Sequence, residues 1–404
     1  MDFLCKVYIQ PIAYNMKGVF KFLSLVIILE TTSFFTLKIY HNNFQTGQVS
    51  DFSFTDIQKE KILKFLDEGH HYRCFDSLIG WMNKPTTSVS QISGKRNINI
   101  NINEDGFRAN RKYKKIKDLN VTRILALGDS FTFGSEVDDL ECWSSILECK
   151  DSNLEVLNAG VPGFGLDQSL LYFNELKKTW NPDVVVVSYM TMMWMRHLNT
   201  FPPFRSKRSI PLSKPRFILK NGKLKLVDNY LNTQQKYKFF LEKPNDVSIQ
   251  LGKNDYFYST QFGSTTHQYG NFANLMYLLL GNVPKQKSEL YVNGYYNKEH
   301  DGFRVTEAIL DEFVNVIREA RAKPIILFFP TTQDIKRMQE INNPAYRVYK
   351  PLYEKVIEMD VHCFDFSSEF CELDRDLLFE KNGHYSPFVN KIIANKILGL
   401  INSL

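Results

Sequence analysis

Short apolar runs alternate with stretches of helical spacing in two parts of the chain, residues 119–200 and 298–404. The run DVVVVSY at 183–189 is apolar almost throughout and rich in β-branched residues, which is typical of a central strand in a parallel sheet. Runs of this kind predict strands at 123–127, 154–158, 183–189, 324–329 and 361–366. Helical spacing predicts helices at 142–147, 167–179, 305–320, 345–359 and 387–400. This alternation predicts an α/β fold built on a doubly wound parallel sheet.

The rest of the chain lacks this alternation. Residues 57–66 have the spacing of a further helix, and residues 201–297 contain several prolines and many aromatic residues, which indicates a cap-like insertion. We therefore predict six segments. They are a tail at 1–16, a transmembrane signal anchor at 17–40, a tether and extended lead-in at 41–118, a first core part at 119–200, the insertion at 201–297 and a second core part at 298–404.

The predicted anchor depends on the apolar stretch FLSLVIILETTSFFTL at residues 22–37. With its apolar neighbours this stretch reaches the length of about 20 residues that a bilayer requires. Basic residues on its N-terminal side predict a cytoplasmic N-terminus and an extracytoplasmic domain held by a single membrane pass. Glu30 stands against this prediction, because a carboxylate inside a bilayer is unfavourable. The alternative is a buried helix of a soluble domain.

Composition removes several classes of function. The 50 basic and 44 acidic residues leave a net charge of +6, and no dense basic stripe with interleaved aromatics occurs, so we expect no nucleic-acid partner. The six cysteines form no CxxC motif, and no histidine pair has zinc-ligand spacing, so we expect neither a metal nor another cofactor. Two pairs, Cys142 with Cys149 and Cys363 with Cys371, are candidate disulfides if the domain is exported.

Several polar or small residues come directly after predicted strands. In an open α/β sheet, ligands bind beyond the carboxyl ends of the strands, so these residues mark a candidate site. They are Ser130, Gly160, Gly163, Thr191, Thr331 and Asp365.

Ser130 is the candidate nucleophile of this site. It follows a buried strand in LGDSFTFG and begins a helix, where its own backbone N–H is free to stabilise an oxyanion. A serine nucleophile needs a general base, and His384 in KNGHYSP lies just before the last predicted helix. Taken singly, a serine in a GDS tripeptide is more often a helix cap, and a histidine in such a loop is more often structural.

Three blocks taken together resemble the SGNH, or GDSL-type, hydrolases: LGDSFTFG, NAGVPGFG about 30 residues later, and GHYSP near the C-terminus. The resemblance covers residues 119–195 and 303–404. The upstream stretches LIGWMNKP and INEDGFR also look like the region that precedes this domain in membrane-anchored bacterial relatives. The resemblance implies a flavodoxin-like three-layer α/β/α sandwich. It implies Ser130 as nucleophile, His384 as base, and the backbone N–H groups of Ser130 and Gly163 as oxyanion donors.

The sequence departs from the family pattern in its third oxyanion donor. Where the family has an Asn, this chain has Met192 and Met193, and a methionine side chain donates no hydrogen bond. Thr191, Arg196 and His197 are the candidate replacements.

The second departure concerns the acid that supports the histidine. The family places it three residues before the histidine, where this chain has Lys381. The alternatives are Asn382 orienting the imidazole, a carboxylate from elsewhere such as Asp365 or Glu380, or a backbone carbonyl that completes a Ser–His dyad. We expect Asp129 to hold the turn together rather than to carry a proton.

These residues predict a serine esterase that hydrolyses an O-acyl ester, such as an acetyl ester, on a glycan or lipid. The alternative is a non-catalytic or acyl-transferring module of the same fold, acting in surface-polysaccharide assembly. The missing oxyanion Asn and triad Asp motivate that alternative.

Overall fold

The computed structural model describes residues 16–44, 52–261, 272, 275–276, 289–343 and 345–404. The chain forms two compact units, one of residues 1–51 and 259–287 and one of residues 52–258 and 288–404. All of the predicted tail at 1–16 except Met16 lies outside the described residues.

The predicted anchor segment is helical, as part of α1 (Met16–Phe44). Across the described residues, however, none of the helices combines the length and the apolar character that crossing a bilayer requires. Glu30, Thr31, Thr32 and Ser33 interrupt the apolar run in its middle. The transmembrane anchor predicted for residues 17–40 therefore has no support.

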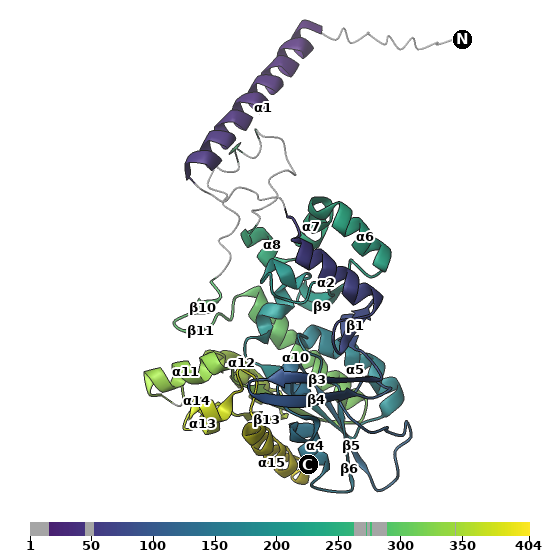
Figure 1. Cartoon of the computed structure of the whole chain (residues 1–404). Helices are drawn as coiled ribbons and strands as arrows, with labels where there is room; N and C mark the ends of the chain where they lie inside the picture. Colours follow the sequence, from purple (N-terminus) through teal and green to yellow (C-terminus); the bar gives the residue numbers. More distant parts are fainter. Residues whose placement is uncertain (1–15, 45–51, 262–271, 273–274, 277–288, 344) are drawn as a thin grey trace, which may run out of the picture. The chain divides into compact units, whose positions relative to one another are not determined.

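The second unit is built around a five-stranded parallel sheet (Figure 1). Its strands are β5 (Thr122–Leu127), β6 (Leu154–Asn158), β7 (Val184–Met190), β12 (Lys323–Phe329) and β13 (His362–Asp365), in the order β13-β12-β7-β5-β6. Each strand lies within one residue of its predicted bounds, so the predicted parallel sheet is confirmed. The order is the flavodoxin-like one, with a topological switch point between β5 and β7.

Helices cover both faces of this sheet. On one face α4 (Trp143–Glu148) contacts α15 (Pro387–Asn402), and on the other α5 (Leu166–Trp180) contacts α10 (Asp301–Glu319), which also contacts α12 (Lys350–Glu358). Right-handed crossovers place α4 and α5 on opposite faces, because the chain moves outward from β5 to β6 and then back to β7. The result is a three-layer sandwich.

Two helical predictions near the C-terminus need correction. The helix predicted at 345–359 begins only at Lys350, because Pro351 occupies its first turn and the residue before a proline disfavours helical geometry. The helix α11 (Thr332–Ile341) was not predicted. Shorter helices complete this part of the chain: α3 (Ser130–Phe133), α13 (Ser367–Phe370), α14 (Arg375–Leu378) and the 3-10 turn η1 (Asp139–Glu141).

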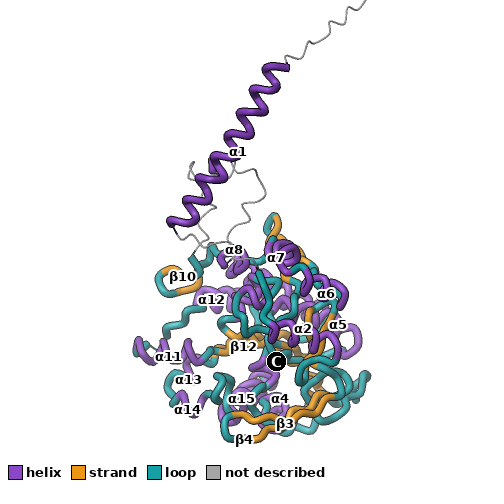
Figure 2. Tube along the Cα trace, turned by 45° about the horizontal axis from the view of Figure 1, so that its top comes forward, coloured by secondary structure: helices purple, strands orange, loops and turns teal. Residues whose placement is uncertain are grey.

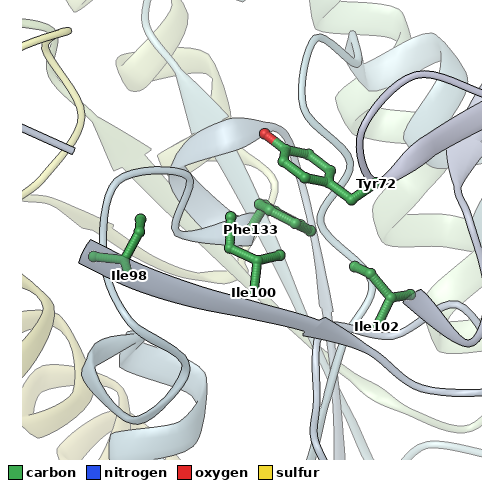
Figure 3. Packing of buried hydrophobic residues seen from close by; sticks show 5 residues of the cluster. All are labelled: Tyr72, Ile98, Ile100, Ile102 and Phe133. Atoms are coloured by element: carbon green, nitrogen blue, oxygen red, sulfur yellow. The ribbon is translucent and has the colours of Figure 1, made fainter. Parts of the chain in front are cut away.

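The lead-in begins with α2 (Asp56–Asp67) and continues as two antiparallel hairpins, β1 (Arg73–Asp76) with β2 (Gly80–Asn83) and β3 (Thr87–Ser93) with β4 (Arg96–Ile102). The alternation of asparagine and isoleucine along β4 points its isoleucines to one side. Figure 3 shows Ile98, Ile100 and Ile102 gathered with Tyr72 around Phe133, a residue of α3. The lead-in hairpin thus packs directly on the helix that begins at Ser130.

The predicted insertion has its own secondary structure. It follows η2 (Met193–Leu198) and contains η3 (Pro202–Phe204), the hairpin β8 (Arg216–Lys220) with β9 (Lys223–Val227), α6 (Gln234–Glu242), α7 (Pro244–Gly252), α8 (Tyr256–Gln261) and the short pair β10 (Tyr291–Val292) with β11 (Tyr295–Tyr296). In Figure 2, α6 and α7 lie beside α2, and α6 contacts both. The insertion therefore packs against the lead-in.

The two candidate disulfides are not formed. Cys142, Cys149, Cys363 and Cys371 are all free thiols, and so is Cys74.

Candidate active site

The turn after β5 presents Ser130 at the carboxyl edge of the sheet. Asp129 caps α3 by accepting a hydrogen bond from the backbone N–H of Phe131 at 3.0 Å, and Gly134 ends this single turn in the left-handed region at a φ of 77°. Ser130 is 8% exposed and lines a pocket of about 420 Å³. Asp129 has the structural role predicted for it.

His384 approaches the same pocket from the loop before α15, and Glu136 supports it. The Nδ1 of His384 lies 2.8 Å from Oε2 of Glu136. The His384 backbone N–H donates to the same carboxylate oxygen at 3.1 Å, and Asn382 donates to Oε1 through its backbone N–H and its side-chain amide, at 3.1 and 2.8 Å. Ser130, His384 and Glu136 all line the pocket. The three side chains therefore share one pocket, and a hydrogen bond joins His384 to Glu136.

The pKa of Glu136 shows how firmly this carboxylate is held. Burial alone would raise it, but the hydrogen bond from the His384 side chain and the backbone N–H groups of Asn382 and His384 outweigh burial and lower the pKa to about 2. Glu136 is therefore ionised at neutral pH. An ionised carboxylate only accepts hydrogen bonds, so Nδ1 of His384 carries a proton and the neutral imidazole has Nε2 free to act as a base.

The carboxylates considered from sequence, those of Asp365 and Glu380, form no hydrogen bond with the His384 side chain. Asp365 accepts hydrogen bonds from the Tyr349 hydroxyl at 2.8 Å and the Ser367 backbone N–H at 2.9 Å, and forms an ion pair with Arg347. Its position at the end of β13 is thus structural, and its predicted role as the supporting acid is wrong.

Two further alternatives near the histidine also need correction. Glu380 accepts from Arg96 at 3.3 Å. Asn382 orients the carboxylate of Glu136 rather than the imidazole. A backbone carbonyl is not needed to complete a dyad, because Glu136 occupies the position at Nδ1.

Two backbone N–H groups suit an oxyanion. The N–H of Ser130 is in the first turn of α3, where a helix offers it no acceptor, and the N–H of Gly163 has no acceptor among the described residues. Gly163 adopts a φ of 91°, and a Cβ there would lie 2.7 Å from Ile210, so the position requires glycine. Both residues line the pocket.

The structure distinguishes between the three candidates for the third oxyanion donor. The Thr191 hydroxyl donates to Asp334, and Thr191 does not line the pocket. Arg196 does line it. Its Nη1 donates to Asp129 at 2.8 Å and to the Phe164 carbonyl at 2.6 Å, while Nε and Nη2 have no acceptor among the described residues. Arg196 therefore has N–H groups left to offer, and Thr191 does not.

His197 is excluded by burial. It is fully buried, its Nε2 accepts from the Leu166 backbone N–H at 2.9 Å, and its Nδ1 lies 2.7 Å from the Thr306 hydroxyl. Burial lowers its pKa to about 3, so the ring is neutral and structural.

The lead-in segments brace both catalytic loops. Trp81 donates from Nε1 to the Pro162 carbonyl at 3.1 Å, and Asn83 donates from Nδ2 to the Gly160 carbonyl at 2.9 Å. The buried Arg108 donates to the carbonyls of Phe133 at 3.0 Å and Val137 at 2.7 Å. These three residues come from the upstream stretches LIGWMNKP and INEDGFR. Through these hydrogen bonds the two upstream stretches hold the loops that carry Gly163 and Glu136 in place.

The hydrogen bond from Trp81 to the Pro162 carbonyl can be removed by a single substitution. Trp81→Phe should keep the packing but remove the hydrogen bond to Pro162, loosening the loop of Gly163, and lower kcat for ester hydrolysis about ten-fold with little change in KM. The matched control is Trp143→Phe, because Trp143 is also fully buried but its indole N–H has no partner among the described residues. If both variants lose the same activity, Trp81 acts only through packing.

Ser130 lies between two hollows. Besides the first pocket, a second hollow of about 350 Å³ is lined by Ser130 and His384, by three apolar side chains (Phe131, Met190 and Met192), and by polar ones that include Arg196, Arg205 and Gln333. Among the described residues no cluster of His, Cys, Asp and Glu side chains has the geometry to hold a metal ion.

No protein-family model matches the chain, and no curated protein does. Solved structures do. The psychrotrophic esterase EstA from Pseudoalteromonas sp., in a form inhibited by monoethylphosphonate, is 12% identical, and the match covers 70% of this chain and 97% of that one at a TM-score of 0.34. The lipase/acylhydrolase from Enterococcus faecalis is 13% identical over 70% and 96% of the two chains, at 0.35. The acetyl xylan esterase AlAXEase is 11% identical over 69% and 100%, at 0.37.

Proposed function

We propose that this chain is a serine ester hydrolase of the SGNH type that works through a Ser130–His384–Glu136 triad. The observation that carries the proposal is the 2.8 Å contact between Nδ1 of His384 and Oε2 of Glu136, in a pocket that Ser130 also lines. A histidine held by a buried carboxylate, in the same pocket as a serine at a helix start, has the components of a system that makes a hydroxyl nucleophilic.

In this proposal each residue acts in turn. His384 takes the proton from Ser130 Oγ as that oxygen attacks the ester carbonyl, and Glu136 stabilises the imidazolium that forms. His384 then gives the proton to the departing alcohol, which leaves an acyl group on Ser130. Water, deprotonated by the same histidine, releases the acid and restores the serine. Among the described residues Ser130 Oγ has no hydrogen-bond partner, and catalytic hydrogen bonds of this kind often tighten only when substrate is bound.

Arg196 takes the part that an asparagine plays in the family that the sequence resembles. It links the nucleophile turn, through Asp129, to the loop of Gly163, through Phe164. With the N–H groups of Ser130 and Gly163 it supplies donors for the developing oxyanion. One such donor is worth about 10²–10³-fold in rate. This explains why methionines at 192 and 193 are compatible with catalysis.

The acyl group is predicted to be small, and its carrier to be a glycan or a lipid. The second hollow favours a short acyl chain, because its apolar lining of Phe131, Met190 and Met192 adjoins Ser130 directly.

Labelling with a serine-directed fluorophosphonate tests the proposal. The probe should form one adduct per chain, and peptide mass spectrometry should place it on Ser130. Ser135 and Ser209 line the same pocket and serve as internal controls, because they lack a histidine partner among the described residues. An adduct on either of them, or no adduct on folded protein, would contradict the triad.

A further inference from the structure

We propose that the first pocket binds a negatively charged group in the alcohol part of the ester, such as a carboxylate, sulfate or phosphate close to the scissile bond. This inference rests on the proposed function and specifies its substrate. It depends on the charges around the pocket, on their partners, and on the contrast between the two hollows beside Ser130.

Basic side chains dominate the lining of this pocket. Five line it: Arg73, Arg196, Arg205, Arg208 and Lys214. Glu136 is the one acidic residue among the described residues of the lining, and it is engaged by His384 and Asn382. A pocket with this excess of positive charge attracts anions and repels cations.

Two of the five cations are neutralised by buried carboxylates. Lys214 forms an ion pair with Asp167, and Arg196 pairs with Asp129 at 2.8 Å. The other three, Arg73, Arg205 and Arg208, form no ion pair with any described residue. These three arginines, which we call the free arginine group, supply the unbalanced charge.

Arg205 is the strongest candidate to bind an anion, because its buried guanidinium lacks a partner among the described residues. Its Nε is buried and has no hydrogen-bond partner among the described residues. Burial, together with repulsion from Arg196, lowers the pKa of Arg205 to about 10, so the side chain is still charged at neutral pH. A buried guanidinium without an acceptor is unfavourable, and a bound anion would offset that penalty. Arg205 also lines both hollows, which places it beside Ser130 and His384.

Arg73 adds a second unsatisfied guanidinium from the lead-in. Its Nε is also buried without a partner, and its guanidinium carbon lies 5.6 Å from the centre of the Tyr72 ring and 5.8 Å from that of Phe65. These contacts hold the side chain by cation–π attraction while leaving its donors unused. Arginine presents a planar fork of donors that suits the paired oxygens of carboxylate, sulfate and phosphate groups.

The polarity of the two hollows assigns the anion to the alcohol side. The first pocket also presents Asn199, whose buried Oδ1 has no partner among the described residues, and Ser209. Such groups suit a hydroxylated alcohol such as a sugar. The second hollow shares Arg196 and Arg205 with the first pocket but adds three apolar side chains beside Ser130, those of Phe131, Met190 and Met192. Arg73, Arg208 and Lys214 line the first pocket and not the second, so the positive charge is greater on the side of the first pocket.

Matched substrates test this assignment. The full-length protein should hydrolyse a mono-O-acetylated methyl glucuronoside with a kcat/KM about ten- to a hundred-fold above that of the same acetylated methyl glucoside, because one charge-assisted contact is worth that factor. 4-Nitrophenyl hemisuccinate, whose charge is in the acyl part, should be no better than 4-nitrophenyl butyrate. Equal rates for the two sugar esters, or a preference for the hemisuccinate, would overturn the proposal.

Substitutions in the free arginine group should remove the preference selectively. Arg205→Gln should lower the ratio of kcat/KM for the acidic sugar ester to kcat/KM for the neutral one by about ten-fold or more. Arg208→Gln is exposed, so it serves as a second variant that does not threaten folding. Lys207→Gln is the control, because it removes the same charge from an exposed neighbour that does not line the pocket. If Lys207→Gln reduces the preference for the acidic ester as much as the arginine variants do, the preference comes from long-range electrostatic attraction and the proposed anion site is wrong.

A binding measurement separates this inference from the proposed function. Calorimetry on the Ser130→Ala variant should show that methyl glucuronoside binds and methyl glucoside does not, and Arg205→Gln added to that variant should abolish the difference. Such binding supports the anion site even if fluorophosphonate labelling fails. Hydrolysis without any selectivity for the anion retains the esterase and overturns the anion site.

Discussion

Replacing Ser130 by alanine will lower kcat for hydrolysis of 4-nitrophenyl acetate by at least about 10⁴-fold, and replacing His384 by alanine will do the same. Each change removes a member of a unit that works only when complete. The double variant should therefore be no slower than either single variant. Steady-state kinetics on the three proteins, with circular dichroism to show that each is folded, checks the expectation.

The control for this experiment is Ser135→Ala. Ser135 also lines the pocket, and its buried hydroxyl has no partner among the described residues, so its loss should leave kcat within a few-fold of the wild type. Retention of more than a tenth of the activity in Ser130→Ala would rule out Ser130 as the nucleophile.

Glu136→Gln should lower kcat by about 10³–10⁴-fold although it preserves the size of the side chain. The amide cannot stabilise the imidazolium that forms on His384, and it offers Nδ1 a neutral partner in place of a charge.

Glu380→Gln is the matched control for Glu136→Gln. Glu380 lies four residues before the catalytic histidine but pairs with Arg96 instead, and Arg96 keeps Glu141 as a second partner. We expect kcat within about two-fold of the wild type. A large loss of kcat in Glu380→Gln together with a small loss in Glu136→Gln would show that Glu380, and not Glu136, is the acid that supports His384.

Glu136 also links stability to pH. Its pKa in the folded protein, about 2, is below its ordinary value of 4.5, so its ionised form stabilises the fold. That contribution is complete above about pH 4.5 and is lost as the pH falls towards 2. In Glu136→Gln this part of the acid destabilisation should be absent from the unfolding curves.

The sheet was predictable because its strands carry the strongest local pattern in the chain. The runs at 123–127 and 183–189 are buried on both faces, so every position is under the same selection for apolar residues. The strand β4 has an equally clear pattern, the alternation RNININI, which is typical of a strand with one buried face. The prediction for this region was only an extended lead-in, so the hairpin of β3 and β4 was missed. For the helix predicted to begin at residue 345, the sequence signal for the true start was Pro351, which lies in the first turn of α12.

Three of the site residues followed from motifs, and the acid did not. Ser130 and Gly163 lie in short blocks after β5 and β6, His384 lies in the loop before α15, and all three line one pocket. The acid was sought near His384 in the sequence, because the resemblance placed it there. Glu136 lies in the first block instead, in FGSE, and nothing in the local pattern distinguishes a buried carboxylate there from a solvated one. The one available signal was Lys381, whose presence showed that the acid had to come from elsewhere.

The free arginine group was unpredictable for a different reason. Arg205 and Arg208 come from the insertion and Arg73 from the lead-in, and neither segment repeats a pattern that fixes where its side chains point. Their convergence depends on how α2 and the hairpins pack against the insertion, which is a tertiary property.

Glu136 lies only six positions after Ser130 on one braced segment, whereas its contact with His384 spans 248 positions of sequence. Ser130 and Glu136 are therefore held by one local segment, and His384 joins them through a contact that is distant in sequence. Closing so long a loop is entropically unfavourable, so we expect this contact to form late in folding. In a refolding experiment, the return of ester turnover would therefore lag behind the return of helical signal. The time course of recovered ester turnover would then report when the loop that carries His384 docks.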